Sequence, residues 1–171
     1  SLTPNAVDRL NRYMRQGGVI VFDSRHGGIG TTQRHLRDLL RQLDVPPLDP
    51  LPNDPVMNRT FYLVQDAPGR YMDGQVWVEA EVKKEQSDPA LPFRKLNDGV
   101  TPVIIGSNDW AAAWAINEQG DPMYPIGCGR AGERQREMAI RFGINLVMHV
   151  LTGNYKSEQV HVPAWLDRLG Q

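Results

Sequence analysis

Two short apolar runs, each followed directly by a polar loop, constrain the fold of this chain more than any other feature. Residues 19–22 read VIVF and residues 103–106 read VIIG. Neither run alternates between apolar and polar residues, which is typical of strands covered on both faces of a parallel sheet. Helices usually connect and cover such strands, so the sequence predicts an α/β layered domain.

Helical patterns lie on both sides of the first run. Thr3 followed by Pro4 is an N-cap with proline at the first helical position, and this helix is expected to end at Gly17. Leucines at i, i+3, i+4 and i+7 predict an amphipathic helix over residues 33–43. The longest helix is expected over residues 133–151. Its second half, INLVMHVL, is apolar at nearly every position and must therefore be covered.

The middle of the chain has weaker signals. Five prolines between Pro46 and Pro55 are expected to exclude regular structure there. Residues 60–64 are a candidate strand. Residues 75–82 alternate apolar and polar side chains, which predicts a half-exposed strand that is antiparallel or at an edge. Gly153 is placed to end the long helix.

Composition excludes several classes of function. The 171 residues suit one α/β domain over 1–171, and a formal net charge of −1 gives no field that favours nucleic acid. Cys128 is the single cysteine, so an internal disulfide and a cysteine-based zinc cluster are excluded. No apolar run reaches the roughly 18 residues of a membrane span. The domain is expected to be soluble, with any membrane link outside this chain.

The best candidate site lies where the two apolar strands end. In open α/β sheets, ligands bind beyond the carboxyl ends of the strands. If the strands are parallel, two loops share this rim and present Asp23, Ser24, Arg25 and His26 beside Ser107, Asn108, Asp109 and Trp110. The alternative is that these short polar side chains only cap helices or bind loop amides.

A hydrolase can be assembled from Ser24 or Asp23 with His26, Asp109 or His161. The motif G-x-S-x-G is missing around Ser24, which weakens this reading. The glycine loop GGIGTT does not complete a dinucleotide fingerprint, and the four histidines lack metal-ligand spacing. No cofactor and no metal are therefore expected.

Three stretches together resemble a known family. They are LTPNAVDRLNRYMRQGGVIVFDSR, GVTPVIIGSNDWAAAWA and RFGINLVMHVLTGNYKSEQVHVPAWLDRLGQ. They are similar to a bacterial domain-of-unknown-function family, number forty-one fifty-nine, of the class I glutamine amidotransferase-like superfamily. The resemblance implies a three-layer αβα, flavodoxin-like fold with a mainly parallel sheet. It also implies that the chain is an excised C-terminal domain that lacks N-terminal strands and comes from a membrane protein with a double-transmembrane region.

The resemblance also bears on activity. Active amidotransferases of the superfamily place a cysteine in a nucleophile elbow, and counting from Gly17 puts that position on Asp23 or Ser24. Neither residue fits, so catalysis is not expected. The resemblance implies a ligand-sensing or protein-interaction module of a bacterial membrane-associated protein. The ligand residues expected at its rim are Asp23, Arg25, Ser107, Asn108, Asp109 and Trp110, and its partners would be proteins or a small molecule.

Overall fold

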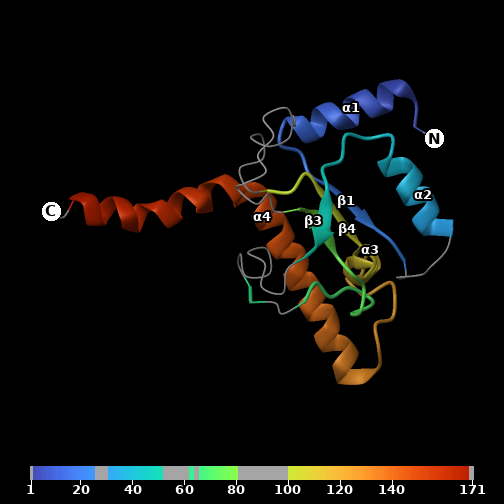
Figure 1. Ribbon diagram of the computed structural model, residues 1–171. Helices are drawn as coiled ribbons and strands as arrows, with labels where there is room; N and C mark the ends of the chain where they lie inside the picture. Colours follow the sequence, from blue (N-terminus) through green and yellow to red (C-terminus); the bar gives the residue numbers. More distant parts are fainter. Residues whose placement is uncertain (1, 26–30, 52–61, 64–65, 81–99, 170–171) are drawn as a thin grey trace.

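The fold is that of a computed structural model. It describes residues 2–25, 31–51, 62–63, 66–80 and 100–169, with only the backbone described for 31–33 and 153–169. Within these residues the chain is an α/β domain with one four-stranded sheet and helices around it (Figure 1). No helix in the described part of the chain is long and apolar enough to cross a membrane.

The sheet has the strand order β1-β4-β3-β2. β1 (Ile20–Asp23) pairs in parallel with β4 (Val103–Gly106), so both strands end at the same edge. β3 (Trp77–Glu79) pairs antiparallel with β4 and with β2 (Leu48–Pro50). The sheet is therefore mixed, and the expectation of a mainly parallel sheet is wrong. The alternating pattern around β3 already indicated an antiparallel strand, because alternation is typical of strands with one exposed face.

Helices form where their capping and packing signals lie. In α1 (Pro4–Arg15), the Thr3 hydroxyl accepts a hydrogen bond from the Ala6 amide at 3.3 Å, as the N-cap pattern predicts. α2 (Thr31–Leu40) confirms the amphipathic helix, although it ends three residues before the predicted boundary. A short α3 (Trp110–Trp114) follows β4, and a long α4 (Gly129–Leu169) completes the described chain.

Two local expectations about helix and strand limits are wrong. α4 continues through Gly153. A glycine ends a helix when it takes a left-handed conformation, whereas inside a helix it costs only about 1 kcal/mol relative to alanine. The proline-rich segment contains the short strand β2, which is last in the strand order. A strand there tolerates Pro50, because an edge strand need not donate on its outer side.

The first apolar run is less covered than expected. Val21 in β1 is 37% exposed, whereas its neighbour in register, Ile104 of β4, is fully buried. The reason is that the helix α4 packs over β4 and not over the outer strand β1 on this face. Of the candidate strand 60–64, Tyr62 and Leu63 are described and are not in a strand, and the other three residues lie outside the described residues.

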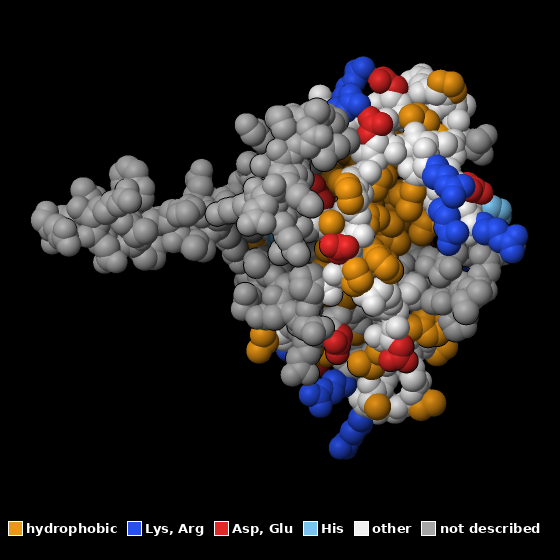
Figure 2. Space-filling view, viewed as in Figure 1, with side chains coloured by type: hydrophobic (Ala, Val, Ile, Leu, Met, Phe, Trp, Pro, Cys, Tyr) orange, Lys and Arg blue, Asp and Glu red, His pale blue; other side chains and the backbone are white. Residues whose placement is uncertain are grey.

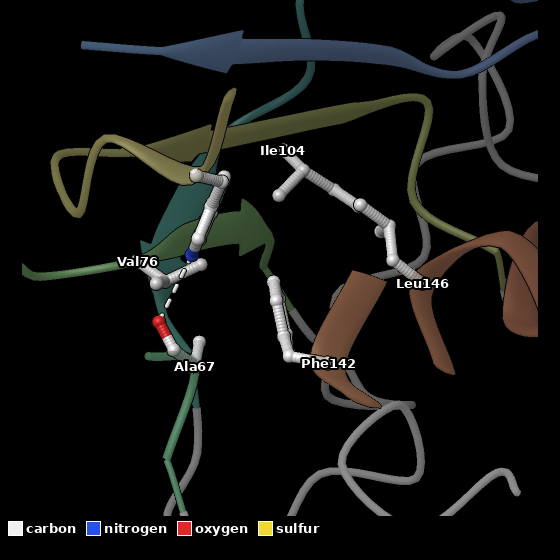
Figure 3. Close-up of a cluster of buried hydrophobic side chains, with 6 residues drawn as sticks. Ala67, Val76, Ile104, Phe142 and Leu146 are labelled. Carbon is white, nitrogen blue, oxygen red and sulfur yellow. Dashed lines mark hydrogen bonds between the residues drawn. The ribbon is translucent and has the colours of Figure 1, made fainter. Parts of the chain in front are cut away.

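Apolar side chains pack on both faces of the sheet. On one face, Met14 of α1 packs with Leu43 and Val103. On the other face, Phe142 and Leu146 of α4 point toward Ile104 (Figure 3). Figure 2 shows further apolar side chains in the middle of one face of the molecule, with basic side chains toward its margins. The sheet is thus held between helices, and the ends of β1 and β4 are fixed relative to each other.

Candidate functional site

The loops that follow β1 and β4 meet at one edge of the sheet. Asp23 lies opposite Gly106 in the parallel register, and Arg25 forms an isolated antiparallel bridge with Asn108. The structure therefore places the β1 loop beside the β4 loop, as the parallel pairing requires. His26 lies outside the described residues, and only the backbone of His161 is described, so neither side chain is placed at this rim.

Asp23 caps the helix that follows the neighbouring strand. Its Oδ2 accepts a hydrogen bond of 2.7 Å from the Ala111 amide, and the amides of Trp110 and Asp109 also face the carboxylate. Burial raises the pKa of Asp23, and the charge of Asp109 raises it further, while the three backbone amides lower it; the net direction is upward. The carboxylate thus connects β1 to the start of α3.

Asp109 has the unusual backbone of this site. Its φ of 53° and ψ of 55° are left-handed, and it is the one non-glycine residue with positive φ in the described part of the chain. Its side chain is 6% exposed, and its Oδ2 lies 3.6 Å from Nη1 of Arg70. That distance is longer than a hydrogen bond, so the contact is an ion pair without a hydrogen bond.

The strand, left-handed residue and helix around Asp109 have the form of a nucleophile elbow. Ser107 and Ala111, two residues before and after it, are small, as an elbow requires. Asp23 and Ser24 do not have positive φ, so the elbow is not at the position counted from Gly17. The small residues of this elbow are visible in the sequence SNDWA, residues 107–111. The sequence analysis placed the elbow at Asp23 or Ser24, by counting from Gly17, and so did not find it.

One backbone donor of this elbow is already engaged in the described structure. The amide of the residue after a nucleophile normally stabilises an oxyanion. Here the amide of Trp110 faces the Asp23 carboxylate instead. Ser24 donates its hydroxyl proton to the Gly106 carbonyl at 3.2 Å. The rim therefore has an elbow backbone in which the Trp110 amide is already in use.

Asn108 holds the 66–76 loop against β4. Its Nδ2 donates to the carbonyls of Ala67 at 2.7 Å and Gly74 at 3.3 Å, and its Oδ1 accepts from the Gly74 amide at 2.7 Å. Trp110 donates from Nε1 to the same Ala67 carbonyl at 3.0 Å (Figure 3). Both side chains are buried, at 1% and 0% exposure. Asn108 and Trp110 are thus occupied by structural contacts.

Two carboxylate oxygens at the rim accept no hydrogen bond from the described residues. They are Oδ1 of Asp23 and Oδ2 of Asp109, and both atoms are buried. Buried polar atoms are nearly always satisfied, so two such atoms on neighbouring strand ends require an explanation. Among the described residues, no group of three or more His, Cys, Asp or Glu side chains is arranged to hold a metal ion.

A concave surface lies at the start of α4. A groove of about 500 Å³ runs between the segment before α4 and the first turns of α4. Its lining includes the apolar residues Pro125, Ile126 and Ile140 and the acidic residues Glu133 and Glu137. Arg136 is tied to the carbonyls of Ala113 and Tyr124. The sequence did not predict this groove, because no strand end leads to it.

The outward side of α4 continues the apolar lining of the groove. Ile140, which lines the groove, is 43% exposed, and Ile144, Val147 and Leu151 are 38%, 56% and 74% exposed. The core-facing residues Phe142 and Leu146 lie on the other side of the helix. We call the four exposed residues the α4 stripe. The expectation that the apolar half of this helix is covered is met on the core side of α4 and not on the stripe.

Comparison with known proteins gives a family without an assigned activity. No curated protein matches the chain. The family model described as "Domain of unknown function (DUF4159)" matches residues 1–151, which include all described strands and both loops of the rim. The chain therefore belongs to this family of domains of unknown function.

Proposed function

We propose that this chain is a protein-interaction module and not a hydrolase, and that it associates through the α4 stripe. The observation that carries the proposal is a helix that is apolar on two opposite sides. One side is buried against Ile104 and Trp110, and the other keeps four large aliphatic side chains exposed in the described structure. A contiguous exposed apolar surface of this kind marks a binding site more often than a free surface.

The spacing of the stripe fits another helix. Ile140, Ile144, Val147 and Leu151 follow one another at intervals of four, three and four residues. With 3.6 residues per turn, they fall within an arc of about 60° on the helix. Alternating intervals of four and three are those of the a and d positions of a coiled coil. The α4 stripe can therefore insert its side chains between those of a second helix with the same spacing.

The partner we propose is a second copy of this chain. The sequence of intervals reads the same in both directions, so two copies of the stripe match in an antiparallel pair, with Ile140 against Leu151 and Ile144 against Val147. A two-fold pair uses the same surface on both subunits, which a symmetric stripe satisfies. The groove adjoins Ile140 and extends the apolar surface beyond the end of the stripe.

The energetics indicate a weak association. Full burial of a leucine or isoleucine contributes about 1.5–3 kcal/mol, and half-exposed side chains have about half of this left to gain, or about 1 kcal/mol each. Eight side chains in two copies then contribute about 8 kcal/mol, against an association cost of about 4–15 kcal/mol. We therefore expect a dimer that forms and dissociates with concentration.

Sedimentation velocity of the full chain over a range of concentrations tests the proposal. Val147→Glu and Ile144→Glu place a charge in the stripe and are expected to give monomers at concentrations where the unmodified chain dimerises. Met72→Glu is the matched control. Met72 is 52% exposed, close to the 56% of Val147, but it lies outside the stripe. A chain that stays monomeric throughout, or a dimer unaffected by both stripe substitutions, would contradict the proposal.

The proposal includes the setting implied by the resemblance. We propose an amidotransferase-like domain whose elbow carries Asp109 in place of a catalytic cysteine or serine, and which belongs to a bacterial membrane-associated protein. In support, the amide of Trp110 faces Asp23, and Ser24 is bound to a backbone carbonyl. The alternative is a hydrolase that uses Asp23 or Ser24 with His26, Asp109 or His161. Turnover of ester or amide substrates that disappears in both Asp23→Ala and Asp109→Ala would favour this alternative.

A further inference from the structure

One face of the sheet carries a row of apolar side chains that the described helices cover only in part. Phe22 of β1, Ile105 of β4 and Trp77 of β3 are partners in the strand register, so their side chains lie next to one another on the same face. Ile104 points to the opposite face, where α4 packs against it. The row therefore lies on the face of the sheet away from α4 and from the α4 stripe.

Trp77 is the most exposed member of this row. Phe22 and Ile105 are half-buried and pack against the core cluster next to α1, whereas Trp77 is 39% exposed and belongs to none of the described core clusters. The indole N–H of Trp77 donates to no described residue, unlike those of Trp110 and Trp114. A tryptophan with a large apolar surface and an unused donor is typical of the residues that dominate protein interfaces.

α2 gives this face a basic margin. In Figure 2, apolar side chains are visible where Figure 1 draws the strands, and basic side chains lie on the side where it draws α2. Residues 31–41 include Arg34, Arg37 and Arg41 and one acidic residue, Asp38, which lies 3.7 Å from Arg41. Arg34 and Arg37 are exposed and form no ion pair with a described residue. Two guanidinium groups at this margin are therefore available to a partner.

We propose that this face binds an amphipathic helix of a partner protein, with the apolar side of that helix against Trp77 and Ile105 and its acidic margin toward α2. An apolar sheet face is buried by a second layer, which in α/β domains is a helix. The guanidinium groups of Arg34 and Arg37 favour carboxylates, which arginine binds in a bidentate way. A nucleic acid fits less well, because Glu79 lies two residues from Trp77 on the same face and repels phosphates.

Fluorescence polarisation of a labelled helical peptide tests the inference. The probe is a peptide of about 15 residues, or about four helical turns, with leucines along one side and glutamates along one margin. Matched peptides carry glutamine or lysine at the glutamate positions. The protein is the full chain with Val147→Glu, so that a charge interrupts the α4 stripe and the two proposals can fail separately.

The charge on the peptide is expected to decide the affinity. The glutamate peptide should bind with saturation, the glutamine peptide about tenfold more weakly, and the lysine peptide more weakly still. No binding of the glutamate peptide, or equal binding of the three peptides, would overturn the inference. Tighter binding of a labelled oligothymidylate than of the glutamate peptide would also overturn it, in favour of a nucleic-acid surface.

Variants of the protein locate the contact. Trp77→Ser removes the apolar anchor, and Arg34→Gln combined with Arg37→Gln removes both charges from a fully solvated helix face; each change is expected to weaken binding of the glutamate peptide about tenfold. Ile116→Ser and Arg134→Gln are the matched controls and should leave the affinity unchanged. Ile116 is 60% exposed in the loop after α3, and Arg134 is exposed on α4. Affinities that are the same in the row or α2 variants as in their controls would overturn the inference.

Discussion

Removal of the Asn108 side chain tests whether the rim is primarily a structural lock. In Asn108→Ala, the Gly74 amide loses its acceptor and the Gly74 carbonyl loses the donor from Nδ2. The Ala67 carbonyl keeps its bond from Trp110 Nε1, so it is not left unpaired. Two backbone groups are therefore left without their partner beside a side chain that is 1% exposed.

The expected loss follows from these two groups. The two Gly74 groups are half-buried, so each is expected to cost about 1–2 kcal/mol, the lower part of the range for a buried group without a partner, and the free energy of unfolding should fall by about 2–4 kcal/mol. Urea unfolding followed by tryptophan fluorescence measures this loss as a lower midpoint at an unchanged slope.

Asn117→Ala is the matched control for Asn108→Ala. Asn117 Oδ1 also accepts two backbone amides, from Gln119 at 3.0 Å and Asp121 at 2.7 Å, but it is exposed. Water replaces the lost partner there, so a loss of only about 0.5–1.5 kcal/mol is expected. If Asn108→Ala destabilises the chain no more than Asn117→Ala, the contacts of Asn108 with the 66–76 loop do not stabilise the fold as described.

Two further predictions concern the same rim. In Gly74→Ala, the new Cβ would lie 2.2 Å from Asn108 Oδ1 and 2.6 Å from Ser107 Oγ, so overpacking should lower the free energy of unfolding by about 1–3 kcal/mol in urea titrations. A neutral Gly74→Ala would show that the loop lies elsewhere. For Asp23, the folded state binds its proton more tightly than the unfolded state, because the folded pKa is raised above the ordinary 3.8. The free energy of unfolding of the unmodified chain, relative to that of Asp23→Asn, should therefore rise as the pH falls through the raised pKa toward 3.8. The melting temperature of the unmodified chain minus that of Asp23→Asn should rise in the same direction. A difference that does not change with pH would refute this prediction.

The sequence predicted the parts of the fold that depend on local patterns. The Thr3-Pro4 cap, the amphipathic α2 and the apolar run of β4 carry their signals within a few residues, and each is confirmed. The alternation of residues 75–82 indicated the antiparallel strand β3, whereas the mainly parallel sheet implied by the resemblance is wrong. β2 was missed because five nearby prolines argue against a strand, although an edge position tolerates them.

The candidate site was predictable in place but not in detail. Two polar loops after apolar strands indicated the rim, and the parallel pairing of β1 with β4 brings Arg25 to Asn108. The contacts of Asn108 with Ala67 and Gly74 were not predictable, because they join residues 34 to 41 positions apart. The role of Arg70 was missed for the same reason. Neither distance nor burial of such pairs is encoded in a local pattern.

The sequence predicted part of the α4 stripe. The apolar run INLVMHVL showed that α4 needs cover, but the run alone does not tell which residues face the core. The structure assigns Phe142 and Leu146 to the core and leaves Ile144 and Val147 exposed. The described chain therefore covers the core side of the apolar half of α4 and leaves the α4 stripe exposed.

Cross-linking at a single position of α4 tests the central claim most directly. In a Cys128→Ser background, which removes the exposed native thiol, Val147→Cys places a thiol in the stripe and Arg134→Cys places one on an exposed position of the same helix outside it. With a short bismaleimide linker, association through the stripe predicts covalent dimers of Val147→Cys and none of Arg134→Cys. Equal cross-linking of the two variants, or none in either, would contradict it.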